Sequence, residues 1–417
     1  MQIPRNIYLD RLIRKKQNHL VKVVTGMRRC GKSYLLFELF KQHLLEEGVP
    51  EDHIIEMVFD AFENRQYCNP DVFFPYLMDR ISADGEYYIL LDEVQLLGEF
   101  EAVLNSLLRR KNVDIYVTGS NARFLSKDVI TEFRGRGDEI HMYPLSFAEY
   151  MTAYDGSVSD AWKDFVVYGS LPMIFDFPIA EDKTVFLKAL LDETYLSDIV
   201  GRHKIRNKAE FSELVNILSS AVGSLTNPAK LSSTFHSVKK KTISPATIQN
   251  YIDYLCDAFL IDKAIRYDVK GKRYIDTPSK YYFTDLGLRN ARLNFRQIEE
   301  THAMENVIFN ELKIRGWSVD VGVITQNFKN TNGNGARRQL EIDFVCNKGS
   351  KRCYIQSAFA MPDTEKEEQE QRSLLLTGDF FKKIIITKDT PAPHYNDNGV
   401  LIMNVFDFLL DAESLEK

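Results

Sequence analysis

Cysteine is scarce in this sequence, with five in 417 residues, and none of them forms a CxxC pair. Thiolate metal sites and disulfide frameworks both need regularly spaced cysteines, so neither is expected. The sequence also lacks an apolar run of about 18 residues, the length that crosses a bilayer, and its first residues contain no apolar signal segment. These absences predict a cytoplasmic protein with free thiols and no membrane contact.

A strong excess of one charge is absent as well. The formal net charge is −6 at pH 7, which is small for a chain of 417 residues. The chain as a whole is therefore not a polycation built to bind nucleic acid. Because one domain takes roughly 100–200 residues, several domains are expected.

A short apolar segment, Val21–Thr25, leads directly into a glycine-rich loop that ends in Gly31-Lys32-Ser33. The β-branched segment predicts a buried strand, and leucines at helical spacing after the loop predict a helix. This is the G-x-x-x-x-G-K-[ST] spacing in the strand–loop–helix context of a P-loop. The residues expected to bind ATP are Gly26, Met27, Arg28, Arg29, Cys30, Gly31, Lys32, Ser33 and Tyr34.

The residue types in this loop suit phosphate chemistry. Glycines let the backbone curl so that its N–H groups face phosphate oxygens. Lys32 is expected to reach the β- and γ-phosphates, and the Ser33 hydroxyl is expected to ligate Mg²⁺. Arg28 and Arg29 either contact phosphate as well or stay solvated.

A second apolar run, Tyr87–Leu91, ends in the acidic pair Asp92-Glu93. An aspartate at the carboxyl end of a strand beside a P-loop is placed to hold the magnesium shell. Glu93 suits a general base that polarises the attacking water. Acidic residues are common at strand ends, and the P-loop upstream is what favours these roles.

A third predicted strand, Asp114–Thr118, is followed by Ser120 and Asn121. At the carboxyl edge of a parallel sheet, these polar side chains are candidates to sense the γ-phosphate or to orient water. They are equally suited to capping the next helix. The sequence leaves both roles open.

Two arginines, Arg134 and Arg136, lie in the segment Phe133–Gly137 before a further predicted strand. Either arginine is a candidate finger that reaches the γ-phosphate in a neighbouring subunit. The alternative is that both are ordinary surface arginines.

The segments GMRRCGKSYLL, YYILLDEVQ, IYVTGSNARFL and FRGRGDEIHMYPLSFAEY resemble the AAA+ ATPase module (AAA_14 type) of prokaryotic proteins with a DUF4143 C-terminal region. Tyr168–Pro172 resembles the family's G-G-[FL]-P lid segment, with Ser170 in place of the second glycine. The resemblance implies an AAA+ core, a small helical lid and ATP hydrolysis, and it favours Arg136 as the finger. By analogy with AAA+ rings, it also implies a homo-oligomer.

The middle of the chain, from 209 to 295, predicts three short helices followed by a β-hairpin, which is the winged-helix arrangement. Residues 225–292 hold twelve Lys or Arg against six Asp or Glu. Such a local excess suits phosphate contacts, although winged helices also serve as protein-interaction modules and lysine runs are commonly solvated. The candidate DNA contacts are Lys239, Lys240, Lys241, Lys270, Lys272 and Arg273.

The last part of the chain has two of the features of a PD-(D/E)xK nuclease. Glu305 on a predicted helix and Asp343 on a predicted strand match its first two carboxylates. Where a carboxylate-x-lysine is needed, the sequence has Gln356-Ser357-Ala358. An amide and a methyl group cannot hold Mg²⁺ or support an attacking water, so a nuclease-like fold without nuclease activity is expected. The segment 327–338 is a flexible loop by composition.

The sequence therefore predicts an α/β protein in four parts. These are an AAA+ P-loop ATPase core at 1–160, a helical lid and connector at 161–208, a winged-helix domain at 209–295 and a nuclease-like (DUF4143) domain at 296–417. The expected function is Mg²⁺-dependent ATP binding and hydrolysis, coupled to a conformational change in a C-terminal region that contacts DNA or a protein. The alternative is an ATP-binding signalling or scaffold switch with little turnover.

Overall fold

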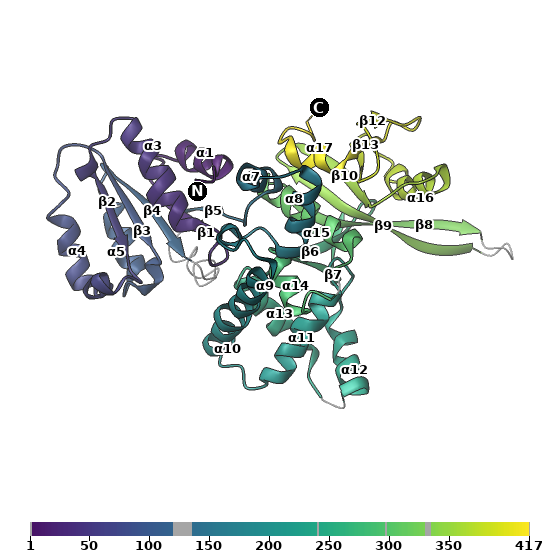
Figure 1. Cartoon of the computed structure of the whole chain (residues 1–417), viewed down its shortest axis with the longest axis horizontal. Coiled ribbons are helices and arrows are strands. Elements are labelled where there is room, and N and C mark those ends of the chain that lie inside the picture. Colours follow the sequence, from purple (N-terminus) through teal and green to yellow (C-terminus); the bar gives the residue numbers. More distant parts are fainter. Residues whose placement is uncertain (1, 120–135, 240–241, 297, 330–334, 417) are drawn as a thin grey trace. The chain divides into compact units, whose positions relative to one another are not determined.

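The computed structural model describes residues 2–119, 136–239, 242–296, 298–329 and 335–416 (Figure 1). The chain forms two compact units. The first consists of Met1–Pro144, Leu171–Met173 and Asp257–Phe259, and the second consists of Leu145–Ser170, Ile174–Cys256 and Leu260–Lys417.

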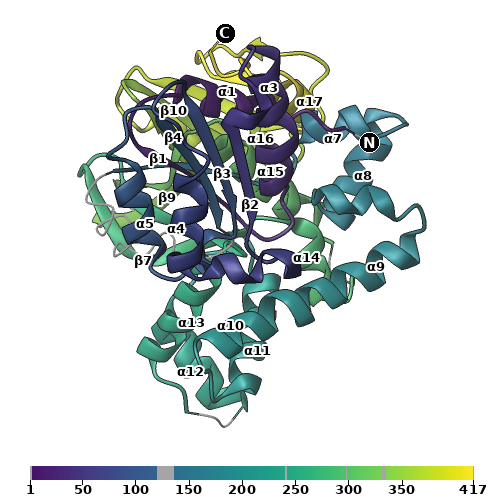
Figure 2. The same cartoon turned by 90° about the vertical axis from the view of Figure 1, so that its left-hand side faces the viewer.

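The first unit contains a parallel sheet of five strands in the order β2-β3-β4-β1-β5 (Figure 2). Its strands are β1 (Val21–Thr25), β2 (Ile54–Val58), β3 (Tyr87–Asp92), β4 (Val113–Gly119) and β5 (Gly137–His141). All residues of β1, β3 and β4 are buried. Near-continuous apolar strands of this kind are typical of a parallel sheet covered on both faces.

Side chains of this sheet form a hydrophobic core with side chains of the helices, among them Phe73, Leu77 and Leu104. The helical segments of the unit are α1 (Asn6–Arg14), α2 (Lys32–Tyr34), η1 (Leu35–Phe40), α3 (Lys41–Glu46), η2 (Glu51–His53), η3 (Phe62–Cys68), α4 (Pro70–Met78), η4 (Val94–Leu96) and α5 (Phe100–Leu107). The segments α2, η1 and α3 follow one another without a break. The predicted order of strand, glycine loop and helix is therefore confirmed.

The second unit contains a mixed sheet of eight strands in the order β12-β13-β11-β10-β9-β8-β6-β7. Its strands are β6 (Ile261–Asp268), β7 (Arg273–Phe283), β8 (Ser318–Lys329), β9 (Gly335–Lys348), β10 (Lys351–Ala358), β11 (Lys382–Thr387), β12 (His394–Tyr395) and β13 (Leu401–Asn404). A buried cluster that includes Ile342, Tyr354 and Ile385 forms its core.

Helices precede, interrupt and follow this sheet along the chain (Figure 1). They are α7 (Phe147–Ala153), α8 (Val158–Tyr168), η6 (Pro172–Asp176), α9 (Ala180–Ala189), η7 (Leu190–Leu196), α10 (Ser197–Arg202), α11 (Lys208–Ser220), α12 (Pro228–Lys239), α13 (Pro245–Asp257), α14 (Leu286–Arg292), α15 (Glu300–Ile314), α16 (Thr364–Leu375) and α17 (Val405–Leu410). The side chain of Asp285 caps α14 and also accepts a hydrogen bond from the Ser170 N–H at 2.7 Å, which ties the predicted lid segment to this helix.

Three helices, α11 to α13, precede the antiparallel hairpin of β6 and β7, in the order expected for a winged helix. However, β6 also pairs in parallel with β8. The hairpin is therefore part of the eight-stranded sheet and not a separate wing, and the winged-helix assignment stays a prediction. The four predicted domain ranges stay predictions as well.

Composition alone gave a wrong description of residues 327–338. β8 and β9 pair with each other from Asn327 opposite Arg337 to Lys329 opposite Gly335, so the described residues of the expected loop form a β-ribbon. The five cysteines are free thiols. Among the described residues, no helix has the length and apolar character needed to span a membrane.

Candidate nucleotide-binding site

The loop between β1 and α2 needs glycine at both of its ends. Gly26 has φ of 142°, and a Cβ atom there would lie 2.2 Å from the main-chain oxygen of Met142. Gly31 has φ of 101° and precedes the first helical residue. Residues with a Cβ atom rarely adopt these angles. The two glycines therefore permit the tight curl of the loop, which in a P-loop directs main-chain N–H groups toward phosphate.

The side chain of Lys32 lies across this curl and is only 5% exposed. Its Nζ donates hydrogen bonds to the main-chain oxygens of Gly26 at 3.1 Å and Met27 at 2.9 Å. The loop thus combines amide donors and one cation, which is the donor set that suits a triphosphate.

Three side chains from three elements meet beside the loop. The Ser33 hydroxyl donates to Asp92 Oδ2 at 2.7 Å, and the Thr118 hydroxyl donates to Asp92 Oδ1. Asp92 is 5% exposed at the end of β3, and Thr118 is buried near the end of the neighbouring β4. A hydroxyl and a carboxylate in contact offer the hard oxygen ligands that Mg²⁺ prefers.

Burial raises the pKa of Asp92, while the hydrogen bonds from Thr118 and Ser33 lower it. Glu93 adds a repulsion that raises the pKa of Asp92, and Lys32 adds an attraction that lowers it. A carboxylate held in this state is dehydrated and electrostatically unfavourable by itself. A divalent cation beside it would favour the ionised form, so the residues present fit magnesium.

Glu93 follows Asp92 in a left-handed backbone conformation, with φ of 51°. Its N–H donates to the Thr118 hydroxyl at 3.2 Å, and Gln95 donates to its carboxylate. A non-glycine residue in this conformation stores strain that the surrounding contacts must hold. Thr118 and Gln95 therefore fix the position of the carboxylate expected to act as general base.

Thr118 is a site residue that the sequence analysis missed. The polar residues chosen at the end of β4 were Ser120 and Asn121, which lie outside the described residues. The signal that identifies Thr118 is the strand order: β4 is next to β3, so a hydroxyl near its carboxyl end meets Asp92.

Arg5 is a second residue without a sequence signal, because it lies before the first helix and far from the loop in the chain. Its guanidinium donates to Cys30 O at 3.0 Å, to Tyr143 O at 2.6 Å and to Pro144 O at 3.3 Å. Arg5 is 1% exposed. It therefore ties the phosphate loop to the segment that follows β5.

The structure describes one of the two arginine-finger candidates. Arg134 lies outside the described residues. Arg136 is exposed and immediately precedes β5, where its main-chain oxygen accepts a hydrogen bond from Val21 N–H at 2.9 Å. Val21 begins β1, whereas the phosphate loop follows the other end of that strand. Arg136 therefore lies at the amino-terminal end of the parallel strands, and its own phosphate loop lies at their carboxyl-terminal end.

The candidate DNA contacts are divided between two places in the second unit. Lys239 ends α12, and Lys240 and Lys241 lie outside the described residues. Lys270 and Lys272 are exposed in the turn between β6 and β7. Arg273 begins β7, and its Nε lies 3.6 Å from Asp268 Oδ2.

The two nuclease-like carboxylates do come together in the second unit, and around a lysine. Lys280 Nζ on β7 lies 2.9 Å from Glu305 Oε1 and 3.5 Å from Asp343 Oδ1. Glu341 Oε1 is 2.8 Å from the same Nζ. The expectation of a missing lysine was based on the position Ala358, and the structure supplies a lysine from a different strand. Burial raises the pKa of Glu305 to about 7, although Lys280 opposes this shift.

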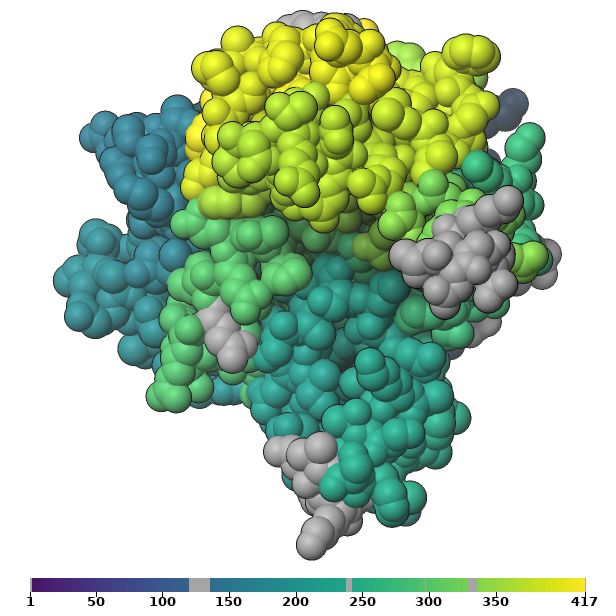
Figure 3. Space-filling model, turned by 90° about the vertical axis from the view of Figure 1, so that its right-hand side faces the viewer, coloured from purple at the N-terminus to yellow at the C-terminus, as the bar shows by residue number. Residues whose placement is uncertain are grey.

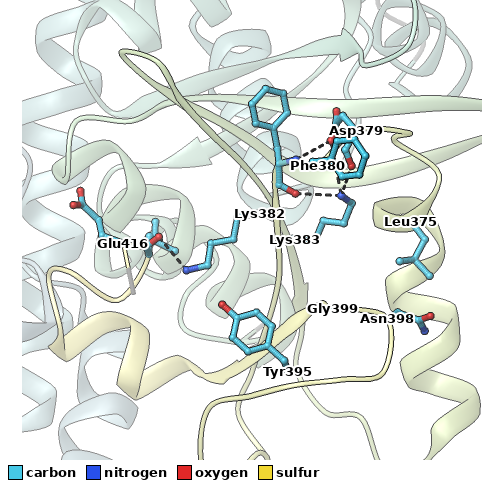
Figure 4. A pocket seen from close by; sticks show the side chains of 11 residues that line it. Leu375, Asp379, Phe380, Lys382, Lys383, Tyr395, Asn398, Gly399 and Glu416 are labelled. Atoms are coloured by element: carbon cyan, nitrogen blue, oxygen red, sulfur yellow. Dashed lines mark hydrogen bonds and ion pairs between the residues drawn. The ribbon is translucent and has the colours of Figure 1, made fainter.

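A separate pocket of about 590 Å³ opens at the far strands of the second unit's sheet (Figure 4). Asp379, Phe380, Lys382 and Tyr395 are among its lining residues. Lys382 Nζ donates to Leu415 O at 3.3 Å. This pocket contains none of the loop residues described above, so it is not a nucleotide site of the P-loop kind.

Two parts of the chain match known families. Residues 18–151 match an AAA domain family, and residues 159–299 match a domain of unknown function, DUF8612. The AAA-type expectation is confirmed. The expected DUF4143 region is wrong, because the part after the ATPase module matches DUF8612; the C-terminal motifs behind that expectation were loose.

Relatives with sequence similarity extend over nearly the whole chain. A protein of Haemophilus influenzae named only as uncharacterized is 33% identical over 419 residues, which is 98% of each chain. An uncharacterized protein of Methanocaldococcus jannaschii is 27% identical and covers 84% of this chain and 77% of its own length. Among solved structures, the Walker-type ATPase of Pyrococcus abyssi is 15% identical, covers 70% of this chain and 96% of its own, and has a TM-score of 0.47.

Proposed function

Because this chain belongs to the same family as the uncharacterized Haemophilus influenzae protein, and residues 18–151 form an AAA domain, we propose that its first unit binds Mg²⁺–ATP and hydrolyses it. One observation carries the proposal: the Ser33 hydroxyl and the Asp92 carboxylate lie 2.7 Å apart beside the glycine loop that Lys32 crosses. Groups that can bind phosphate and groups that can ligate magnesium thus occur together in one site.

Each residue has a distinct role in this proposal. The main-chain N–H groups between Gly26 and Ser33 cradle the phosphates, and Lys32 neutralises the β- and γ-phosphates. Ser33 and Asp92 hold Mg²⁺, which withdraws charge from the phosphate oxygens. Glu93 orients a water molecule and accepts its proton. Thr118 fixes both Asp92 and Glu93 through its hydroxyl and is a positioning residue.

The loop residues other than Gly26, Gly31, Lys32 and Ser33 contribute mainly through their backbone. Met27 and Cys30 are buried, so their N–H groups, and not their side chains, are the groups available to phosphate. Arg29 is exposed beside the loop and Arg28 is partly exposed, which suits additional phosphate contacts. Ser120 and Asn121 are proposed as sensors of the γ-phosphate.

We place ATP turnover in a homo-oligomer. Arg136, or in its place Arg134, reaches the γ-phosphate of a neighbouring subunit as an arginine finger. The position of Arg136, at the sheet edge away from its own loop, supports action on another subunit rather than on its own site.

The second unit is proposed to change its contact with DNA as ATP is turned over. The support is the local excess of cations between residues 225 and 292, with Lys270 and Lys272 exposed in the turn between β6 and β7. Nuclease activity is not proposed, because Lys280 sits among Glu305, Glu341 and Asp343 and neutralises the carboxylates that a metal would need. Mg²⁺- or Mn²⁺-dependent cleavage of DNA by the purified chain would contradict this assignment.

A second candidate function is an ATP-binding switch with little turnover, which acts as a signalling protein or a scaffold. The contact between Lys32 and the loop carbonyls is compatible with slow cycling, since it already holds the lysine side chain within the loop. The two functions differ in rate: a switch releases phosphate at roughly 10⁻⁴–10⁻² s⁻¹ per subunit, as GTPases do without an activating protein, whereas typical enzymes turn over at roughly 1–1000 s⁻¹.

The test is ATP hydrolysis by three purified proteins: the wild type, Lys32→Ala and Glu93→Gln. We expect turnover in the wild type and its loss in both variants. Lys32→Ala should lose ATP binding, whereas Glu93→Gln should retain bound ATP because its phosphate loop and magnesium ligands are intact. If Glu93→Gln hydrolyses ATP at the wild-type rate, the general-base assignment is wrong.

A further inference from the structure

The hairpin of β8 and β9 extends beyond the sheet that contains it. β6 pairs with β8 only at Val321–Val323, and β10 pairs with β9 only at 344–348. From Thr325 to Lys329 and from Gly335 to Gln339, the two strands pair with each other and with no other described strand. Figure 1 shows them running side by side away from the rest of the sheet. We call the residues 325–329 and 335–339 the ribbon.

The ribbon carries positive charge without any balancing carboxylate. Between Asp320 and Glu341 the sequence has no Asp or Glu and has three cations, Lys329, Arg337 and Arg338. Arg337 and Arg338 are both exposed. Among the described residues, Arg337 and Arg338 have no ion-pair partner, so their charge is available to an external anion.

The two arginines point to opposite faces of the ribbon, because neighbouring residues of a strand alternate in direction. Arg338 shares a face with Gln326, whose Oε1 accepts from Arg338 Nε at 3.0 Å, and with Phe328, over whose ring its guanidinium lies at 5.7 Å. Arg337 is opposite Asn327 on the other face. Each face therefore offers one guanidinium and one amide side chain.

The turn between β6 and β7 extends this basic surface at the base of the ribbon. Val269 N–H donates to Val323 O at 3.1 Å, which places the turn next to the point where the ribbon begins. Lys270 and Lys272 in this turn are exposed. The turn and the ribbon belong to the same unit, and β6 pairs with β8 next to the turn. Figure 3 shows the face of the molecule on which this unit, coloured from teal to yellow, forms most of the visible surface.

From these observations we propose that the ribbon binds duplex DNA by entering its major groove, with Arg337 and Arg338 contacting the phosphates on the two sides. The major groove of B-form DNA is about 12 Å wide and accepts a two-stranded ribbon, whose strands are about 4.8 Å apart. Cations on both faces match the phosphate strands that border the groove on both sides. Gln326 and Asn327 offer amides, which pair with base edges. Lys270 and Lys272 contact the backbone beside the groove.

This inference rests on the proposed function only in naming DNA as the partner of the second unit. The two are tested separately, because DNA binding is measured without nucleotide and ATP hydrolysis is measured without DNA. A wild-type chain that binds DNA through the ribbon but does not hydrolyse ATP would contradict the proposed function alone.

The experiment measures how tightly two proteins bind a labelled DNA duplex of mixed sequence. The two proteins are the wild type and the double variant Arg337→Ala/Arg338→Ala. Affinity is measured at several salt concentrations from about 50 to 200 mM. We expect the variant to bind at least about tenfold more weakly. The slope of log affinity against log salt concentration should also be smaller in magnitude by about 2, because each lost phosphate contact reduces this slope by about 1. A second pair, Arg337→Gln/Arg338→Gln, removes the same charge and keeps polar side chains.

The matched control is Lys348→Ala/Lys351→Ala, which removes two cations at the opposite end of β9 and the start of β10. This control should keep the wild-type affinity and slope. All variants should keep the wild-type melting temperature and the ATP hydrolysis rate measured without DNA, which shows that they are folded. The proposal is overturned if the arginine variants bind DNA as the wild type does. It is also overturned if the wild type binds no duplex DNA, or binds duplex RNA of the same sequence at least as tightly.

Discussion

At the scale of single residues, the nucleotide site depends on hydroxyl groups as much as on charges. Asp92 receives one hydrogen bond from Ser33 and one from Thr118, and both lower the cost of keeping a buried carboxylate ionised. The Thr118 hydroxyl also accepts from the N–H of Glu93. Thr118 of β4 thus holds both Asp92, the expected magnesium ligand, and Glu93, the expected general base, in position.

Thr118→Ala is expected to reduce ATP hydrolysis by about 10- to 100-fold, a range typical for groups that orient a metal ligand. The reason is that Asp92 loses a donor and the strained backbone of Glu93 loses its anchor. Thr118→Ser keeps the hydroxyl and should retain most of the activity. Steady-state hydrolysis measured across Mg²⁺ concentrations tests this; equal loss in the alanine and serine variants would show that the methyl group, and not the hydroxyl, matters.

A second residue-scale prediction concerns pH and the stability of the second unit. Burial raises the pKa of Glu305 from 4.5 to about 7 in the folded state. Between these pH values the folded state holds a proton that the unfolded state releases, so the free energy of unfolding falls as pH rises from about 4.5 to about 7. Above that range the contribution of Glu305 is constant.

Glu305→Gln should remove this part of the pH dependence and make the second unit more stable than the wild type near pH 8. Denaturant unfolding at pH 5, 6, 7 and 8 measures it, with Glu365→Gln, an exposed residue of α16, as the control. Parallel stability curves for Glu305→Gln and the wild type would contradict the assignment.

At the scale of elements, the phosphate loop is defined by the space around its first glycine. The main-chain oxygen of Met142 lies where a Cβ atom of residue 26 would be, at 2.2 Å. Arg5 holds the same region through hydrogen bonds to Cys30 O and Tyr143 O. The loop is therefore shaped by the segment after β5 and by the chain before α1, and not by its own sequence alone.

Gly26→Ala should lower the free energy of unfolding of the first unit by roughly 1–3 kcal/mol, because of the strained backbone angle and the close oxygen. It should also weaken ATP binding by at least about tenfold, which corresponds to about 1.4 kcal/mol. Gly48→Ala is the matched control: Gly48 has φ of 87° but nothing lies within 4 Å of its added Cβ atom. If both variants bind ATP equally well, the close approach at Gly26 does not shape the loop.

The sequence predicted those elements whose signal is local. The run Val21–Thr25 and the run that ends at Asp92 became β1 and β3 because continuous β-branched and apolar residues identify buried parallel strands. It could not predict the contacts of Arg5 or Thr118, which depend on strand order and on chain segments far apart in sequence. The cation Lys280 was missed for the same reason, since it reaches Glu305 from β7 instead of from the expected position on β10.

Residues 327–338 show how composition misleads at this scale. Asn, Gly and Thr favour loops when they are considered one by one, yet paired strands extend to Lys329 and resume at Gly335. Strand pairing supplies the hydrogen bonds that a composition-based reading ignores.

At the scale of the whole molecule, one chain contains an AAA-type ATPase unit and a second unit with its own eight-stranded sheet. Arg136 lies away from its own loop, which supports the proposal that it completes the site of a second copy of the chain. Under this proposal, ATP turnover is a property of an oligomer.

The specific hydrolysis rate of the wild type should therefore rise with protein concentration until assembly is complete. Arg136→Ala should lower the rate at saturating concentration by about 10³-fold or more, the effect expected of an arginine finger, without weakening ATP binding. Mixing inactive Lys32→Ala with inactive Arg136→Ala subunits should restore part of the activity, because each supplies what the other lacks. A rate per subunit that is independent of concentration, or unchanged in Arg136→Ala, would exclude a finger at this position; Arg134→Ala is then the variant to test.

The central claim is that the glycine loop, Lys32, Ser33 and Asp92 form one Mg²⁺–ATP site. The most direct measurement is calorimetric titration of ATP into the wild type with and without Mg²⁺, and into Lys32→Ala and Asp92→Asn. We expect the wild type to bind one ATP per chain saturably, and to bind it more weakly without Mg²⁺. Mg²⁺ should have little effect on ATP binding by Asp92→Asn, and Lys32→Ala should not bind ATP. Absence of ATP binding by the folded wild type, or equal affinity in Lys32→Ala, would contradict it.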